Sequence, residues 1–273
     1  MSGKLYVVGT PIGNLGDFSP RGMETLDCVD FIAAEDTRVT LKILNRFEIK
    51  KPLISYFEHN KFSKGEYIAE RILNGENCAL VTDAGMPAIS DPGEDLVKLC
   101  RESGIEIESV PGPCAFTTAL AISGMPSKRF TFDGFPPVEK KERADFFNSL
   151  VNEKRTIVLY EAPHKLGATL SDLLTYLGNR EIAIVRELTK IHEQVIKTDL
   201  ESAVVSYGDN SLKGEIVLII TGAPDNAVVS MTFEDGVKYA LDLIENGETK
   251  TNAAKIAAKE SGYKKGEIYK KLI

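Results

Sequence analysis

Three turns rich in glycine and proline each follow a short apolar run that predicts a β-strand. They cover residues 9–14, 82–87 and 111–115, after the runs LYVV, CALV and IESV. In a parallel α/β sheet, ligands bind outside the carboxyl ends of the strands, where glycine lets the backbone approach a ligand closely. Any one turn could merely reverse the chain, but the three together predict one shared pocket.

The residues in these turns favour a ligand without phosphate groups. The sequence has neither the G-x-G-x-x-G turn of dinucleotide sites nor the G-x-x-x-x-G-K-[ST] loop of nucleoside triphosphate sites. Backbone donors and a carboxylate such as Asp83 can instead hold amino, carboxylate and ribose groups.

Alternating strand and helix patterns predict an α/β unit over residues 1–123 that positions these turns. Its strands are predicted at 5–8, 31–34, 53–56, 78–81 and 107–110. Helical periodicity predicts helices at 64–74, 93–103 and 115–122.

A second α/β unit is predicted over residues 124–224. Its strands are predicted at 130–135, 156–160, 182–186 and 215–221, and a charged helix at 139–152. Periodicity leaves open whether these strands run parallel or antiparallel.

Residues 225–273 predict a small helical module. We expect an amphipathic helix at 232–246 and two short helices within 249–272, broken at 261–263. Residues 250–273 hold seven Lys and two Glu, so the module is either a helix-turn-helix that docks on phosphates or a solvated tail packed on the body.

Composition excludes several classes of protein. The 273 residues carry a net charge of −7, with 43% hydrophobic and 27% charged residues, which is typical of globular chains of one or two domains. No apolar run approaches a membrane span, and the four cysteines form no CxxC pair. We expect a cytoplasmic protein without a metal site or membrane contact, and no indiscriminate binding of nucleic acid.

Eight motifs carry a specific family resemblance. They are GTPIGNLGDFSPR (9–21), AAEDTR (33–38), EHN (58–60), VTDAGMPAISDPG (81–93), VPGPCA (110–115), FDGFPP (132–137), YEAPHK (160–165) and RELTKIHEQV (186–195). In their order and spacing, the chain resembles the 16S rRNA 2′-O-methyltransferases of the tetrapyrrole methylase superfamily over residues 3–222. The basic tail resembles the small C-terminal domain of that family.

The resemblance implies a class III S-adenosylmethionine methyltransferase: two α/β domains with the cofactor in the cleft between them, and a homodimer. The implied substrate is the ribose 2′-hydroxyl of a cytidine in the decoding region of 16S rRNA, position 1402 in the usual numbering, within the small ribosomal subunit. The positions that match the family's cofactor-binding residues are Pro11, Ile12, Asp83, Met86, Cys114, Ala115, Glu161 and Leu188. Cys114 stands where many relatives carry Ser or Thr, and Met86 where Thr is commoner.

Methyl transfer to a ribose hydroxyl needs in-line positioning and a base, or a cation that stabilises the developing alkoxide. All three histidines of the chain fall inside the motifs, and histidine titrates near neutral pH. We expect Glu58 with His59, and Glu161 with His164, at the polar ends of the acceptor pocket. Which group takes the proton stays open, because such residues also form loop salt bridges and helix caps.

Four cations are predicted to contact RNA phosphate or ribose groups: Arg38, Lys165, Arg186 and Lys190. Each could instead pair with a neighbouring carboxylate, such as Asp36 or Glu187. The segment 136–143, with Lys140, Lys141 and Arg143, is either a mobile arm against RNA or an exposed helix start.

Two other functions remain as alternatives. A precorrin-type tetrapyrrole methylase would share the fold and the cofactor, but it has no evident use for the basic tail. A noncatalytic RNA-binding ribosome-assembly factor would keep the fold without the chemistry.

Overall fold

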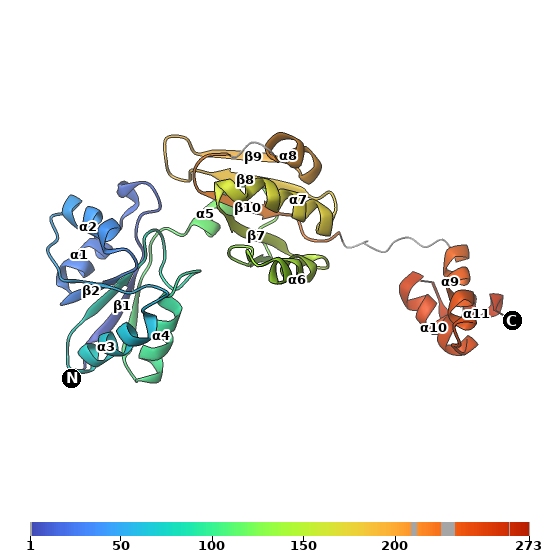
Figure 1. Ribbon diagram of the computed structural model, residues 1–273, viewed down its shortest axis with the longest axis horizontal. Coiled ribbons are helices and arrows are strands. Elements are labelled where there is room, and N and C mark those ends of the chain that lie inside the picture. The colour runs from blue at the N-terminus through green and yellow to red at the C-terminus, as the bar shows by residue number, and fades with distance from the viewer. Residues whose placement is uncertain (1, 209–211, 225–232, 262, 273) are drawn as a thin grey trace. The chain divides into compact units, whose positions relative to one another are not determined.

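The computed structural model describes residues 2–208, 212–224, 233–261 and 263–272, and the chain divides into two compact units (Figure 1). The larger unit comprises residues 1–150 and 155–221 and holds two five-stranded sheets. The smaller unit comprises residues 151–154 and 222–273. The start of the predicted module, 225–232, and position 262 in its predicted turn lie outside the described residues.

The first sheet is wholly parallel, with strand order β3-β2-β4-β1-β5. Its strands are β1 (Lys4–Val8), β2 (Phe31–Ala34), β3 (Leu53–Ser55), β4 (Cys78–Val81) and β5 (Glu106–Val110). The central strands β2 and β4 are buried along their whole length, as expected where helices cover both faces of a parallel sheet.

Two apolar clusters cover the two faces of this sheet. One joins alternate strand residues to Ile68 of α3 and Leu96 of α4, and the other joins the remaining residues to Leu26 of α1 and Leu44 of α2. The helices are α1 (Pro20–Cys28), α2 (Thr37–Arg46), α3 (Lys61–Leu73) and α4 (Gly93–Glu102). The connections are therefore βα units, which bring the carboxyl ends of all five strands to one edge.

The second sheet is mixed, with strand order β6-β7-β10-β8-β9, and this answers the question that periodicity left open. Only β6 and β7 run parallel; the other three pairs are antiparallel. Its strands are β6 (Phe130–Phe132), β7 (Thr156–Glu161), β8 (Glu181–Arg186), β9 (Gln194–Asp199) and β10 (Ile216–Ile220). The sequence did not predict β9, because this edge strand has no buried residue.

Four helices accompany the second sheet. They are α5 (Ala115–Ile122), α6 (Lys140–Leu150), α7 (Leu166–Leu177) and α8 (Leu200–Tyr207). Ala119 and Leu120 of α5 pack with Val158 and Val217 of this sheet. The helix therefore belongs structurally to the second sheet, although it precedes the domain boundary predicted after residue 123. The predicted boundaries themselves stay predictions.

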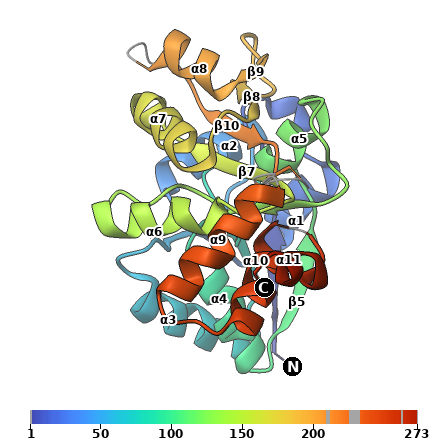
Figure 2. The same ribbon diagram turned by 90° about the vertical axis from the view of Figure 1, so that its right-hand side faces the viewer.

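The smaller unit contains the three predicted C-terminal helices, drawn red in Figures 1 and 2. They are α9 (Phe233–Glu245), α10 (Lys250–Ser261) and α11 (Lys265–Lys271). They pack through apolar side chains, among them the small Ala240 and Ala254 and the larger Ile268. This unit therefore has its own core. Among all described helices of the chain, none is long and apolar enough to cross a membrane.

Candidate active site

The three glycine-rich turns lie together at the carboxyl ends of β1, β4 and β5, as the sequence predicts. Thr10 and Gly85 exchange backbone hydrogen bonds of 2.9 and 3.2 Å. Gly9 meets Gly112 so closely that a Cβ on Gly9 would lie 2.6 Å from the Gly112 Cα atom. Glycine is therefore required at this contact, because any side chain would push the turns apart.

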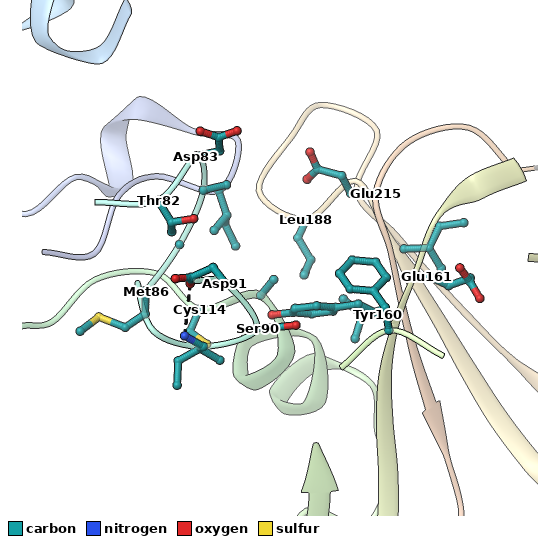
Figure 3. Close-up of a pocket in the computed structure, with 18 of the residues that line it drawn as sticks. Thr82, Asp83, Met86, Ser90, Asp91, Cys114, Tyr160, Glu161, Leu188 and Glu215 are labelled. Atoms are coloured by element: carbon teal, nitrogen blue, oxygen red, sulfur yellow. Dashed lines mark hydrogen bonds between the residues drawn. The ribbon is translucent and has the colours of Figure 1, made fainter. Parts of the chain in front are cut away.

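These turns and one end of the second sheet enclose a pocket of about 430 Å³, within the size range of small-molecule sites (Figure 3). Five acidic residues line it: Glu35, Asp83, Asp91, Glu161 and Glu215. The lining residues that the structure describes include no Lys, Arg or His. The pocket therefore suits a neutral or cationic ligand and repels phosphate groups.

Asp83 is held at the rim by the loop after β2. Its Oδ1 atom accepts a hydrogen bond of 2.9 Å from the Asp36 backbone N–H, while the neighbouring Thr82 hydroxyl donates to the Glu35 carboxylate at 2.5 Å. Burial raises the pKa of Asp83 above its ordinary value. The carboxylate is thus oriented and partly desolvated before any ligand arrives.

Asp91 organises the loop that follows β4. Ala88 and Ser90 adopt left-handed backbone conformations, with φ of 65° and 68°, which are strained for residues with a side chain. The Asp91 carboxylate accepts hydrogen bonds from the backbone N–H groups of Ala88, Ile89 and Gly93 at 3.0, 3.2 and 2.8 Å. These three bonds hold the strained loop against the pocket.

A second strained turn presents Leu188 to the pocket. Glu187 and Thr189, on either side, have φ of 51° and 63°. The Glu187 carboxylate accepts hydrogen bonds from Lys190 Nζ at 3.0 Å and from the Glu215 backbone N–H at 3.1 Å. The bond from Lys190 lowers the pKa of Glu187.

Lys190 also joins this turn to the first glycine-rich turn. A Cβ on Gly13 would lie 2.8 Å from the Lys190 Cγ atom, so the lysine stem packs directly on the Gly13 backbone. The Lys190 ammonium is further paired with Glu215 at 3.4 Å. Lys190 therefore holds the two turns together and pairs with Glu187, as the alternative interpretation allowed. Its predicted contact with RNA stays a prediction.

The structure brings most of the predicted cofactor residues into this one pocket. Those that line it are Ile12, Asp83, Met86, Cys114, Ala115, Glu161 and Leu188. Pro11 is buried next to Ile12 but is not among the lining residues.

Glu161 is 3% exposed, and its carboxylate is already bound within the protein. It accepts hydrogen bonds from the Thr169 hydroxyl and from the Ala162 backbone N–H. In Figure 3 the Glu161 carboxylate lies apart from those of Asp83, Asp91 and Glu215.

Arg143 is held by the same group of residues. It donates to the Thr169 hydroxyl at 2.8 Å and pairs with Asp172 at 2.7 Å. Arg143 is therefore part of an internal network rather than of an arm free to meet RNA.

The other predicted catalytic residues do not reach the pocket. Glu58, His59 and His164 are exposed and are not among its lining residues. Glu58 pairs instead with Lys61 at 2.7 Å. The reason is topological, because Glu58 and His59 follow β3, the edge strand of the first sheet. Of the residues expected at the polar ends of the acceptor pocket, only Glu161 is among those that line this pocket.

The remaining predicted RNA contacts differ in accessibility. Arg38 pairs with Asp36 at 2.6 Å, but its side chain is 87% exposed, and its hydrogen bonds lower the pKa of Asp36 to about 2. Arg186 donates to the Lys213 carbonyl and to Gln194 at 3.1 and 3.3 Å. Lys165 is half-buried beside His164. Of these cations, Arg38 presents the most accessible guanidinium.

Sequence reasoning missed two aromatic residues of the pocket wall, Phe135 and Tyr160. The Tyr160 hydroxyl accepts a hydrogen bond of 3.2 Å from the Phe116 backbone N–H. Burial raises the pKa of Tyr160 to about 12. Both residues stand inside quoted motifs, FDGFPP and YEAPHK, and this was the only signal available for them.

Comparisons with known proteins agree with the sequence resemblance. The family model described as Tetrapyrrole (Corrin/Porphyrin) Methylases matches residues 4–204. A relative from Synechocystis sp. named ribosomal RNA small subunit methyltransferase I is 44% identical over 268 residues, which cover 98% of this chain and 96% of the relative. A relative of the same name from Thermotoga maritima is 45% identical over 220 residues, 81% of this chain and 99% of the relative.

Solved structures share the fold at low sequence identity. A uroporphyrin-III C-methyltransferase from Thermus thermophilus superposes with a TM-score of 0.58 at 18% identity, over 80% of this chain and 94% of that chain. The T. thermophilus uroporphyrin-III C-methyltransferase in complex with S-adenosylhomocysteine gives 0.57 at 14% identity, over 80% and 97%. The chain therefore belongs to the tetrapyrrole methylase family, and within it to the group that contains the ribosomal RNA small subunit methyltransferase I relatives.

Proposed function

We propose that the chain transfers a methyl group from S-adenosylmethionine to the ribose 2′-hydroxyl of a cytidine in the decoding region of 16S rRNA. The names of relatives more than 40% identical support an rRNA methyltransferase. The observation that carries the proposal is the acidic pocket, because it gathers seven of the eight residues that match the family's cofactor positions.

The pocket residues fit this cofactor chemically. S-adenosylmethionine supplies, when bound, an electrophilic methyl group on a positively charged sulfur. Asp83, with its orientation fixed by the Asp36 N–H, would accept hydrogen bonds from ribose hydroxyl or amino groups. Ile12, Met86 and Leu188 supply apolar surface that excludes water. The absence of cations from the described lining also matches a ligand without phosphates.

We assign this chain's main contribution to positioning. An in-line displacement is accelerated when the acceptor oxygen is held against the methyl carbon and water is kept out. The two strained turns, at 88–90 and 187–189, are tied in place by Asp91 and by the Glu187–Lys190 pair, and so form preset walls. The catalytic roles predicted for Glu58, His59, Glu161 and His164 stay predictions, to be tested by substitution.

The RNA and the assembly state complete the proposal. The small ribosomal subunit is the proposed substrate, with the exposed Arg38 and the lysine-rich helices α10 and α11 on phosphates. A homodimer, and domains 1–123, 124–224 and 225–273, are part of the same proposal.

One experiment tests the reaction. Labelled S-adenosylmethionine is incubated with the protein and small subunits that lack the modification, and the rRNA is digested and mapped by mass spectrometry. We expect 2′-O-methylcytidine at the decoding-region site. Transfer to a tetrapyrrole macrocycle instead would favour the alternative of a precorrin-type methylase. Cofactor binding without transfer to any acceptor would contradict the proposal and favour an assembly factor.

A further inference from the structure

Phe135 is an aromatic side chain that lines the pocket and yet stays 55% exposed. It lies between Gly134 and two prolines, in the segment that connects β6 to α6. Its ring contacts the Tyr160 ring, with centroids 5.4 Å apart and planes inclined at 56°. The ring therefore packs on the pocket wall and still offers apolar surface to solvent.

The backbone beneath this ring is fixed from both sides. The Tyr160 backbone N–H donates to the Gly134 carbonyl at 2.9 Å, and the Asp133 N–H donates to the Val158 carbonyl at 3.1 Å. On the other side, Arg143 donates to the Pro137 carbonyl at 3.1 Å. Proline also restricts the backbone to few conformations. An apolar ring exposed on such a segment is organised in advance, so binding a ligand there costs little conformational entropy.

The charge of the pocket restricts which part of an RNA nucleotide can meet this ring. Acidic residues such as Asp83 and Glu215, and no described basic residue, line the pocket. It therefore repels phosphates, and the ribose and base are the parts of a nucleotide that can enter beside the cofactor. A ribose inside a duplex is not accessible to such a pocket, and RNA-modifying enzymes therefore take up unstacked or flipped-out nucleotides. A flipped base has lost its stacking partners and needs a new one.

We propose that Phe135 is the stacking platform for the nucleobase of the acceptor nucleotide. The inference rests on the proposed function and adds to it a residue that recognises the substrate. The exposed ring face contacts the flat face of the base, while Tyr160 supports the ring from the pocket wall. Stacking alone accepts any base, so Phe135 supplies affinity and orientation rather than a choice of cytidine.

The experiment compares variants that keep or lose an aromatic face. Phe135→Trp keeps it, whereas Phe135→Leu keeps an apolar side chain without a ring face, and Phe135→Ala removes both. Phe62 of α3, an exposed phenylalanine (79%) that does not line the pocket, gives the matched control Phe62→Leu. Each variant is measured for KM and kcat on small subunits, for subunit affinity by filter binding, and for S-adenosylmethionine affinity by calorimetry.

We expect Phe135→Leu and Phe135→Ala to weaken subunit binding and raise KM by roughly 5- to 100-fold, the range for loss of one stacked base. Phe135→Trp and Phe62→Leu should stay within about threefold of the unchanged protein, by the same stacking argument. Because Phe135 lines the same pocket as the proposed cofactor residues, cofactor affinity should fall by much less than subunit affinity, and thermal stability should not change. Rescue by tryptophan and not by leucine separates stacking from general apolar contact.

Three results would overturn the inference. They are unchanged subunit binding in Phe135→Leu, a tryptophan variant as weak as the alanine variant, and a loss of cofactor affinity that equals the loss of subunit affinity. The last would mean that the ring contacts the cofactor. Failure of the unchanged protein to methylate subunits would contradict the proposed function instead, and filter binding would still test the platform.

Discussion

Replacing Asp91 tests whether one carboxylate holds the pocket loop after β4 in its strained conformation. Asp91 Oδ1 accepts hydrogen bonds from both Ala88 and Gly93, which are partly buried, whereas Oδ2 accepts only from Ile89, which is exposed. The two oxygens therefore have unequal importance. Asparagine keeps an oxygen that can take the Oδ1 position, and alanine keeps neither oxygen.

The magnitude follows from the donors left without a partner. A buried donor that loses its acceptor costs about 1–3 kcal/mol, while the exposed Ile89 N–H can turn to water. In Asp91→Ala, two partly buried N–H groups lose their acceptor, so we expect the free energy of unfolding to fall by about 2–4 kcal/mol. In Asp91→Asn the loss is about 1 kcal/mol or less, mostly from the negative charge near the N-terminus of α4. Burial, which raises the pKa of Asp91, also makes a neutral side chain easier to accommodate there.

Urea unfolding gives the stability of each variant, and calorimetry gives the affinity for S-adenosylmethionine. Asp91→Ala should lose both, because Met86, Ile89 and Ser90 of the same loop line the pocket. Equal destabilisation by Asn and Ala would refute the reasoning, since it would make the charge rather than the acceptor geometry decisive. If the free energy of unfolding of Asp91→Ala stays within about 0.5 kcal/mol of that of the unchanged protein, the effect of an ordinary surface substitution, the loop keeps its conformation without the Asp91 carboxylate.

Three further predictions concern the cofactor, the turn around Leu188 and the C-terminal helices. Burial raises the pKa of Asp83 above its ordinary value of 3.8. As the pH is lowered, cofactor affinity should therefore begin to fall at a higher pH than it would for an exposed aspartate. In calorimetric titrations, the variant Asp83→Asn should bind the cofactor weakly and without this pH dependence; a variant with the pH profile of the unchanged protein would show that Asp83 does not contact the cofactor. Lys190→Gln breaks the bond to Glu187, so it should lower the free energy of unfolding by about 1 kcal/mol and weaken cofactor binding. A raised KM for subunits, with stability and cofactor binding unchanged, would instead support the predicted contact of Lys190 with RNA. A chain truncated after residue 224 should bind the cofactor as before, because the described pocket lining ends at Val217. In filter binding, its affinity for small subunits should fall and become less dependent on salt. Undiminished affinity for subunits would exclude the C-terminal helices from the RNA contact.

Most of the fold could be predicted because its strands are short, continuous apolar runs. The run at 78–81 and the run at 31–34 coincide with β4 and β2, which are buried on both faces. The edge strand β9 escaped prediction for the opposite reason, since none of its residues is buried and its exposed and half-buried residues show no clear alternation. Periodicity also cannot give strand direction, so the antiparallel β7-β10-β8 arrangement became known only from the pairing.

The site could be predicted where its chemistry lies in the backbone and not where it depends on side-chain partners. Glycine at positions 9, 85 and 112 indicates close approach whatever surrounds it, and the turns do converge. For a charged residue, a motif indicates only partners within the same motif, such as Glu187 for Lys190. The other partners, Glu215 of Lys190 and Thr169 of Glu161, come from sequence segments that nothing links to them.

Topology explains why Glu58 and His59 do not line the pocket. A residue that follows the carboxyl end of a strand lies on the edge of the sheet where ligands bind. Its position along that edge depends on the place of its strand in the sheet, and the pocket forms at only one such position. Glu58 follows β3 at the margin, whereas Asp83 follows β4, two strands further in. The strand order β3-β2-β4-β1-β5 is set by crossovers, and no local pattern in the sequence encodes it.

The charge distribution suggests how an acidic protein can act on RNA. Acidic residues line the pocket, whereas residues 250–273 hold seven Lys and two Glu. The proposed function therefore assigns attraction to phosphate to Arg38 and these C-terminal helices, outside the pocket, and recognition of the acceptor ribose to the pocket. The match with the Thermotoga maritima relative spans 99% of that relative but only 81% of this chain. A relative can therefore carry the same name although it matches only about four fifths of this chain.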